Sequence, residues 1–318
     1  ATAATVGAAA IGTAFAGVGK QALDAYATWE QAVGGVDTLF KDASGTVQQY
    51  AANAYKTAGV SANSYMEQIT SFSASLISSL GGDTAAAAEM GNMAIVDMSD
   101  NANKMGTSLE AIQQTYQSLA RGNYAMLDNL KLGYGGTKAE MERMIADANK
   151  VKQANGEMAD LSVDKFADVV EAIHIVQTQL GISGISAEEA VELVASGAMT
   201  QEEAFARMGT TAKEAATTIE GSVNSMKAAW GNWLAGLGQE NADMSGLTNQ
   251  LVSSIGTVMQ NVLPRVKVIA QSLVQQIPVL FSGLVSLLPQ PFQQAIGMAG
   301  QALSQGVETI KGMLSGIV

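Results

Sequence analysis

Proline is confined to the C-terminal end of this chain, and its absence elsewhere limits the fold more than any other feature. The 318 residues include Pro264, Pro278, Pro289 and Pro291, so the first 263 residues contain none. Proline removes a backbone donor and clashes with the preceding helical turn, so a long run without it permits uninterrupted helices. Ala, Met, Gln and Glu, which favour helix, are abundant, and strand-like alternation is weak throughout. The sequence therefore predicts an all-α fold.

Glycines and helix-start patterns predict how these helices are divided. The chain has 33 glycines, and we expect the pair Gly34 and Gly35 to interrupt a helix. A Ser or Thr followed three residues later by Glu is the pattern of a capping box, which satisfies free N–H groups at a helix start. This pattern occurs at Thr107/Glu110, Thr137/Glu140, Ser186/Glu189, Thr200/Glu203 and Thr211/Glu214. The expected architecture is a multi-helix array with short Gly-rich turns and a hydrophobic helical C-terminal segment.

The segment 128–137 is the most distinctive of the predicted turns. It reads Asp-Asn-Leu-Lys-Leu-Gly-Tyr-Gly-Gly-Thr, with Gly133, Gly135 and Gly136 around Tyr134 and with Thr137 opening the next helix. Glycine permits sharp turns and close backbone approach. A phosphate loop needs Gly-Lys-Ser/Thr after a strand, whereas this turn follows a helix and has a different order. We therefore interpret it as a structural turn.

Charge is scarce and unevenly distributed. The net charge is −12, which argues against sequence-specific or phosphate-directed binding of nucleic acid. Charged residues make up 14% of the chain, against about 25% in ordinary soluble domains. The segment 268–307 has none at all. Either partner chains bury large faces of this protein, or part of it meets lipid.

These shifts in composition suggest four segments. They are an uncharged Ala/Gly-rich helix at 1–19, a compact helical domain at 20–150, a helical continuation at 151–240, and a hydrophobic, proline-broken segment at 241–318. Small residues four apart in 1–19 favour close helix packing, with membrane insertion as the alternative. The chain begins without Met inside an Ala/Gly/Thr run, so we expect it to be a piece of a longer protein.

The C-terminal segment carries the most apolar face. Residues 268–288 are long enough to cross a bilayer as a helix. A lone lipid-exposed span is disfavoured by the residues in its middle, which are Gln271, Gln275, Gln276 and Pro278. An oligomeric bundle would hide these amides. The face expected to meet lipid or other copies comprises Leu273, Ile277, Leu280, Phe281, Leu284, Val285 and Leu288.

The residues of catalysis and metal binding are nearly missing. The chain has no Cys and a single His, His174, which lies on an apolar helical stretch where a hydrogen-bonded structural role is expected. The residues Asp97, Asp100, Asn101 and Asn103 resemble a calcium loop only loosely, because the Gly and the terminal Glu of such a loop are missing at the required spacing. We expect no catalytic residues, no metal and no cofactor. Trp230 and Trp233 are expected to pack under the next helix, with a membrane interface as the alternative.

Four sequence motifs, taken in order, resemble the core region of tail tape measure proteins from long-tailed phages and prophages of Gram-positive-type hosts. They are Gly-Gly-Val-Asp-Thr-Leu-Phe-Lys at 34–41, Ser-Phe-Ser-Ala-Ser-Leu at 71–76 with glycines at 81–82, Asp-Met-Ser-Asp-Asn-Ala-Asn-Lys-Met at 97–105, and Asn-Tyr-Ala-Met-Leu-Asp-Asn-Leu-Lys-Leu-Gly-Tyr-Gly-Gly-Thr at 123–137. The resemblance covers about residues 20–150 and continues weakly to Trp233. Its signature positions are Gly34, Gly35, Phe40, Asn129, Gly133, Tyr134, Gly135, Gly136 and Thr137.

The resemblance implies a non-enzymatic structural virion protein. Copies of such a chain lie in the lumen of the tail tube, set tube length during assembly, and leave at infection, when apolar parts aid DNA passage through the host envelope. The implied partners are other copies of the chain, with threefold symmetry, tail-tube and tail-tip proteins, tail assembly chaperones and the host membrane. Some family members carry peptidoglycan-cleaving domains, but no such motif is found in this sequence.

Two other functions compete with this one. The two uncharged segments also suit a secreted helical membrane-active or pore-forming protein. A helical enzyme is the weakest alternative, because only an acid-only site would be available to it.

Overall fold

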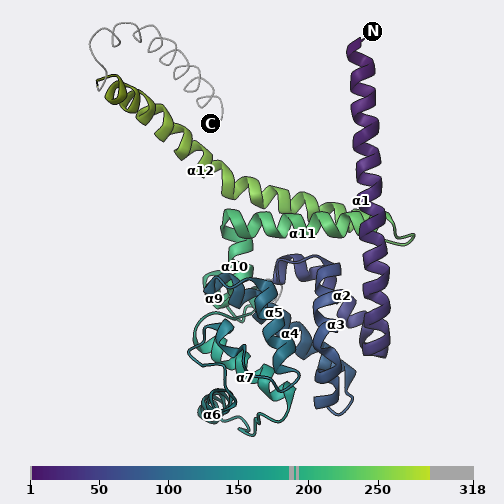
Figure 1. Cartoon of the computed structure of the whole chain (residues 1–318), viewed down its shortest axis with the longest axis vertical. Coiled ribbons are helices and arrows are strands. Elements are labelled where there is room, and N and C mark those ends of the chain that lie inside the picture. The colour runs from purple at the N-terminus through teal and green to yellow at the C-terminus, as the bar shows by residue number, and fades with distance from the viewer. Residues whose placement is uncertain (1, 186–189, 191–192, 287–318) are drawn as a thin grey trace. The chain divides into compact units, whose positions relative to one another are not determined.

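The computed structural model describes residues 2–185, 190 and 193–286, and within them the fold is all-α (Figure 1). The predicted fold class is confirmed. The chain divides into two units, Ala1–Ile255 and Gly256–Val318, which are described separately below. A single isolated bridge, between Ile185 and Met208, is the only strand-like pairing in the described part.

Helices account for most of the described residues of the first unit. In chain order the elements are α1 (Thr2–Phe40), η1 (Lys41–Ala43), α2 (Ser44–Thr57), α3 (Ala62–Ser79), α4 (Thr84–Met105), α5 (Leu109–Leu119), η2 (Leu127–Leu130), α6 (Lys138–Ala154), α7 (Phe166–Gln179), α9 (Gln201–Arg207), α10 (Thr210–Thr217), α11 (Ile219–Leu237) and the start of α12 (Met244–Ser286). Short turns join most of them, as the glycine pattern predicts.

The expected break at Gly34 and Gly35 is wrong, because α1 runs through both residues to Phe40. A side chain added at Gly34 would meet nothing within 4 Å, and one at Gly35 would lie 3.6 Å from the Thr70 methyl group of α3. Neither glycine has the positive φ that marks a turn. The helix instead ends at Phe40, and the next residue, Lys41, adopts a φ of 49°.

One hydrophobic core organises the first unit, and α4 lies at its centre. Helix α4 contacts α2, α3, α5, α7 and α10. The core extends from Ala32 to Ile182, so it includes residues on both sides of the expected segment boundary at 150. Within this core, Phe72 of α3 contacts aromatic rings of two other helices. Its ring centroid lies 6.4 Å from that of Tyr116 on α5 and 6.2 Å from that of Phe166 on α7. Burial of such aromatic and aliphatic side chains is the main force that holds these helices together.

The predicted helix starts have mixed outcomes. At Thr200 the box is complete: Thr200 N–H donates to Glu203 at 2.9 Å, and Glu203 N–H donates to the Thr200 hydroxyl at 3.2 Å. At Thr107 the prediction is off by one residue, because Ser108 is the cap and its Oγ accepts from Ala111 N–H. The box at Thr211 is wrong, because α10 already begins at Thr210. Ser186/Glu189 lies outside the described residues.

Of the two tryptophans, Trp233 contacts the next helix and Trp230 stacks on Trp233. Their rings stack with centroids 5.2 Å apart, and Trp233 Nε1 donates to the Thr248 hydroxyl of α12 at 3.2 Å. A side chain at Gly236 would lie 2.3 Å from Leu247 Cδ1, so glycine permits the close approach of α11 and the start of α12. Trp233 therefore packs against the next helix, as expected. Trp230 remains 39% exposed.

The described part of the second unit is the continuation of α12 to Ser286. Five of its large apolar side chains are strongly exposed: Met259, Leu263, Val266, Val268 and Ile269 are 46–58% accessible. Across the described helices, none combines the length and apolarity that a membrane span requires.

Candidate functional site

The glycine turn at 128–137 is the predicted site that the structure describes most fully. It begins within η2, and two residues in it adopt the left-handed backbone region, Lys131 with φ 54° and Gly133 with φ 85°. This conformation is nearly free of cost for glycine and strained for other residues. The chain reverses here between η2 and α6, which explains why Gly133 occupies its position.

Gly136 has a different reason to be glycine. A Cβ at this position would lie 2.4 Å from the carbonyl oxygen of Ala125 and 3.0 Å from its carbonyl carbon. Both atoms belong to the backbone, so no side-chain rotation would relieve the clash. The last residues of the turn and the segment that precedes η2 therefore pack backbone against backbone.

Thr137 caps α6, as predicted, although half of the expected box is different. The Glu140 N–H donates to the Thr137 hydroxyl at 3.2 Å. The Glu140 carboxylate, however, accepts from Gly135 N–H at 3.2 Å instead of from Thr137 N–H, which donates to Gly135 O. Arg143 pairs with the same carboxylate at 2.6 Å, and this pair together with the Gly135 bond lowers the pKa of Glu140.

Tyr134 closes the turn over α6. Its hydroxyl donates to Asp147 at 3.0 Å, and the Arg143 guanidinium lies 4.2 Å above its ring. Partial burial, followed by the bond to Asp147, raises the pKa of the Tyr134 hydroxyl. A phenol held in this way, beside an ion pair, is a structural clamp and presents no free nucleophile.

The remaining signature residues serve the core. Phe40 is fully buried, and the Asn129 side chain donates to the Thr115 hydroxyl at 3.2 Å while its backbone carbonyl accepts from Thr107. The four motifs of the resemblance thus contribute to one shared core, through Phe40, Phe72, Met98 and Leu130 among others. The structure brings these motifs together, which the sequence order alone could not show.

The expected lipid or oligomer face lies at the end of α12 and just beyond it. Leu273, Ile277, Leu280, Phe281, Leu284 and Val285 lie on α12, but their side chains are outside what the structure describes. Leu288 lies outside the described residues altogether.

A buried cluster of acids and a histidine is the feature that sequence reasoning missed. Both oxygens of Asp97 on α4 lie 3.0 Å from His174 Nδ1 on α7, and Asp100, one turn further along α4, accepts from Thr211 N–H at 2.7 Å. Asp97 and Asp100 are at most 1% exposed. Their i, i+3 spacing is the only sequence signal, and it identifies no partner. His174 is hydrogen-bonded, as predicted.

The cluster has unusual electrostatics. Burial raises the pKa of Asp100 to about 7, helped by the charge of Asp97 and opposed by the Thr211 hydrogen bonds and His174. Burial alone would lower the pKa of His174, but Asp97, Asp100 and Glu171 outweigh it and leave this pKa above its ordinary value. No group of three or more potential metal ligands occurs among the described side chains.

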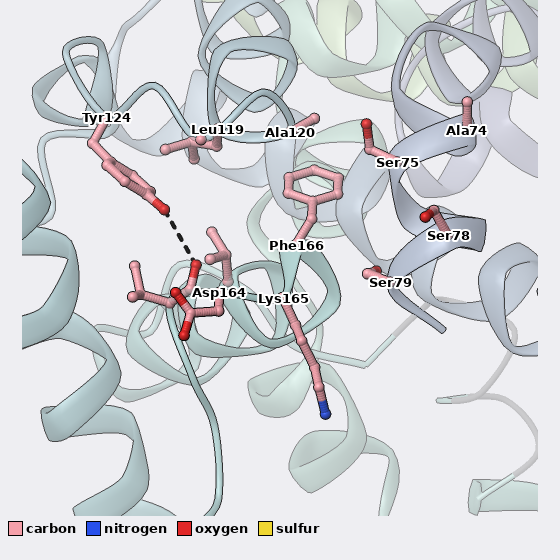
Figure 2. Close-up of a pocket in the computed structure, with 13 residues that line it drawn as sticks. Ala74, Ser75, Ser78, Ser79, Leu119, Ala120, Tyr124, Asp164, Lys165 and Phe166 are labelled. Atoms are coloured by element: carbon pink, nitrogen blue, oxygen red, sulfur yellow. Dashed lines mark hydrogen bonds between the residues drawn. The ribbon is translucent and has the colours of Figure 1, made fainter. Parts of the chain in front are cut away.

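Two cavities adjoin these elements. One, of about 820 Å³, lies between α3, the end of α5 and the start of α7 (Figure 2). At its edge the Tyr124 hydroxyl donates a hydrogen bond to the Val163 carbonyl. Its Ser79 hydroxyl already accepts from Ala167 N–H at 3.1 Å, so the start of α7 is satisfied by the protein. The other cavity, of about 860 Å³, is lined by Asp97 and His174 together with Arg207 and Lys213.

Comparison with known proteins gives no assignment: no protein-family model, curated protein or solved structure matches this chain. The resemblance to tape measure proteins therefore stays a prediction from the residues.

Proposed function

We propose that this chain is a structural, non-enzymatic phage tail protein, which sets the length of the tail tube during assembly and is released at infection. The observation that carries the proposal is the ordered set of four motifs between residues 34 and 137. The shared core formed by these motifs supports the proposal. Motifs that pack into one helical core are expected to be found together in the same family of proteins.

The long helices supply the part of the chain that measures. Helix α1 has 39 residues and α12 has 43, which correspond to about 58 Å and 65 Å at 1.5 Å per residue. A helix converts residue number into distance linearly, whereas the compact unit built on the shared core does not. Length control would therefore depend on helices of the α12 kind, repeated in a longer chain.

The exposed apolar residues of α12 support assembly from several copies. Met259, Val262, Val266 and Ile269 recur at intervals of three and four, the spacing of a coiled-coil seam. Three of these four are 48–58% exposed in the single chain. The proposed partners are further copies of the chain, as a trimer, inside the tube, along with tail-tube and tail-tip proteins and tail assembly chaperones. The acidic net charge would not retain DNA that follows through the same lumen.

A register-preserving deletion tests the measuring role. Removing residues 252–272, which span three heptads, joins Leu251 to Leu273 and keeps the following residues in the same heptad phase. Electron micrographs of assembled tails should then show tubes shorter by about 30 Å, because each helical residue contributes about 1.5 Å. A matched control replaces the same segment by an unrelated heptad-patterned segment of equal length, and its tails should keep their length. Deletion tails of unchanged length would overturn the proposal.

A further inference from the structure

Three titratable side chains meet where α4, α7 and α10 join, and neither the glycine turn nor the proposed length control uses them. Asp97 and Asp100 come from α4 and His174 comes from α7. Helix α10 contributes its N-terminus through Thr211. The cluster therefore connects the centre of the core to the helix that leads into α11.

Asp100 has one satisfied and one unsatisfied oxygen. Its Oδ1 accepts from Thr211 N–H at 2.7 Å, whereas Oδ2 is buried and has no hydrogen-bond partner among the described atoms. A Cβ at Gly209 would lie 2.3 Å from Oδ2, so the absence of a side chain there lets the backbone of α10 close over the carboxyl group. The Thr211 hydrogen bonds favour the ionised carboxylate, but the cost of desolvation in this site outweighs them.

The charges around Asp100 do not remove this cost. His174 is the cation that acts on it, but Asp97 holds the imidazole through both of its oxygens. Asp97 itself adds a like charge one helical turn away. The other titratable groups around the junction are Glu171 on α7, which pairs with Lys152, Tyr116 on α5, Lys104 on α4, Arg207 on α9, and Lys213 and Glu214 on α10.

We propose that Asp100 is a proton-operated latch for α10: the start of this helix stays docked on α4 while Asp100 is protonated, and it undocks more often once Asp100 has ionised. The protonated carboxyl keeps its Oδ1 as an acceptor for Thr211 N–H, so docking retains its hydrogen bond without a buried charge. Undocking exposes Asp100 to water, where its ionised form is solvated.

The sign of the pH effect follows from linkage. Because the docked pKa is raised to about 7 from an ordinary 3.8, docking binds a proton and is strongest at low pH. The stabilisation of the docked state is lost as pH rises from the ordinary pKa of 3.8 to the docked pKa of about 7. Between about pH 5.5 and about pH 8.5 the opening equilibrium constant should increase about 30-fold.

Hydrogen exchange measures this opening directly. Peptides that cover residues 207–217 are followed by mass spectrometry in the full chain, with the intrinsic pH dependence of exchange divided out. Wild-type protection should fall about 30-fold over the stated range. The Asp100→Asn variant should keep the shape of the site, but its protection should change less than about threefold over the same pH range. Asp128→Asn, at an exposed carboxyl on η2, is the matched control and should behave as wild type.

Two results would overturn the latch. One is wild-type protection that does not change with pH, and the other is an Asp100→Asn variant with the full wild-type pH dependence. If that variant fails to fold, carboxyl carbon NMR of the wild-type chain labelled at Asp decides the question. One resonance should titrate near pH 7, and a chain whose aspartates all titrate below about pH 5.5 refutes the proposal.

Discussion

Gly136 offers the sharpest test of how the glycine turn is built. Replacing it with Ala places a methyl group 2.4 Å from the Ala125 carbonyl oxygen, about 1 Å inside an ordinary contact. Since both neighbours are backbone atoms, the turn must move away from the segment before η2. Overpacking of this kind lowers the free energy of unfolding by about 1–3 kcal/mol. The lower conformational entropy of the unfolded Ala chain acts in the opposite direction and raises it by about 0.4–1 kcal/mol. The expected net loss is about 1–2 kcal/mol.

Gly34→Ala is the matched comparison and should have the opposite sign. Gly34 lies inside α1, its added methyl group would meet nothing within 4 Å, and Ala is favoured over Gly in a helix interior by about 0.5–1 kcal/mol. Urea unfolding followed by far-ultraviolet circular dichroism measures both variants, at an unchanged slope of free energy against urea. A Gly136→Ala chain as stable as wild type would refute the close-approach argument, and a destabilised Gly34→Ala chain would refute the continuous helix.

The remaining predictions concern the core and the apolar row of α12. Phe40→Ala should lower the free energy of unfolding by about 3–5 kcal/mol in the same assay, because Phe40 is fully buried, whereas Leu23→Ala, at a 68% exposed position, should change it little. Val266→Glu should shift the chain towards monomer in sedimentation velocity, since it puts a charge on the proposed seam. Val268→Glu, which lies off that spacing, is its control; equal effects of the two would contradict the seam.

Several parts of the fold were predictable because they depend on local physics. The absence of proline before residue 264, the abundance of helix-favouring residues and the scarcity of alternating patterns together predict an all-α fold. The turn at 133–136 and the cap at Thr137 follow from glycine conformation and from the hydrogen-bonding reach of a short hydroxyl side chain. Each needs only neighbours within a few residues.

Other expectations failed where a local pattern has two outcomes. The pair at 34–35 reads as a break, yet Gly35 lies on the side of α1 that faces Thr70 of α3, and a continuous helix satisfies the packing there. Thr211 and Glu214 have the spacing of a capping box, but the Thr211 N–H donates to Asp100, a residue 111 positions away. Tertiary contact decides between the outcomes in both cases.

By itself, the sequence determined the helical class, the turn chemistry at 128–137 and the nearly charge-free end, because composition and short spacings act through the backbone of the same segment. Only the tertiary structure decided that α1 is unbroken, that the four motifs share one core, and that Asp97 and Asp100 face His174 and Thr211. Burial and the hydrogen bonds of these acids depend on helices that are distant along the chain, and no pattern within α4 specifies which neighbour will cover them.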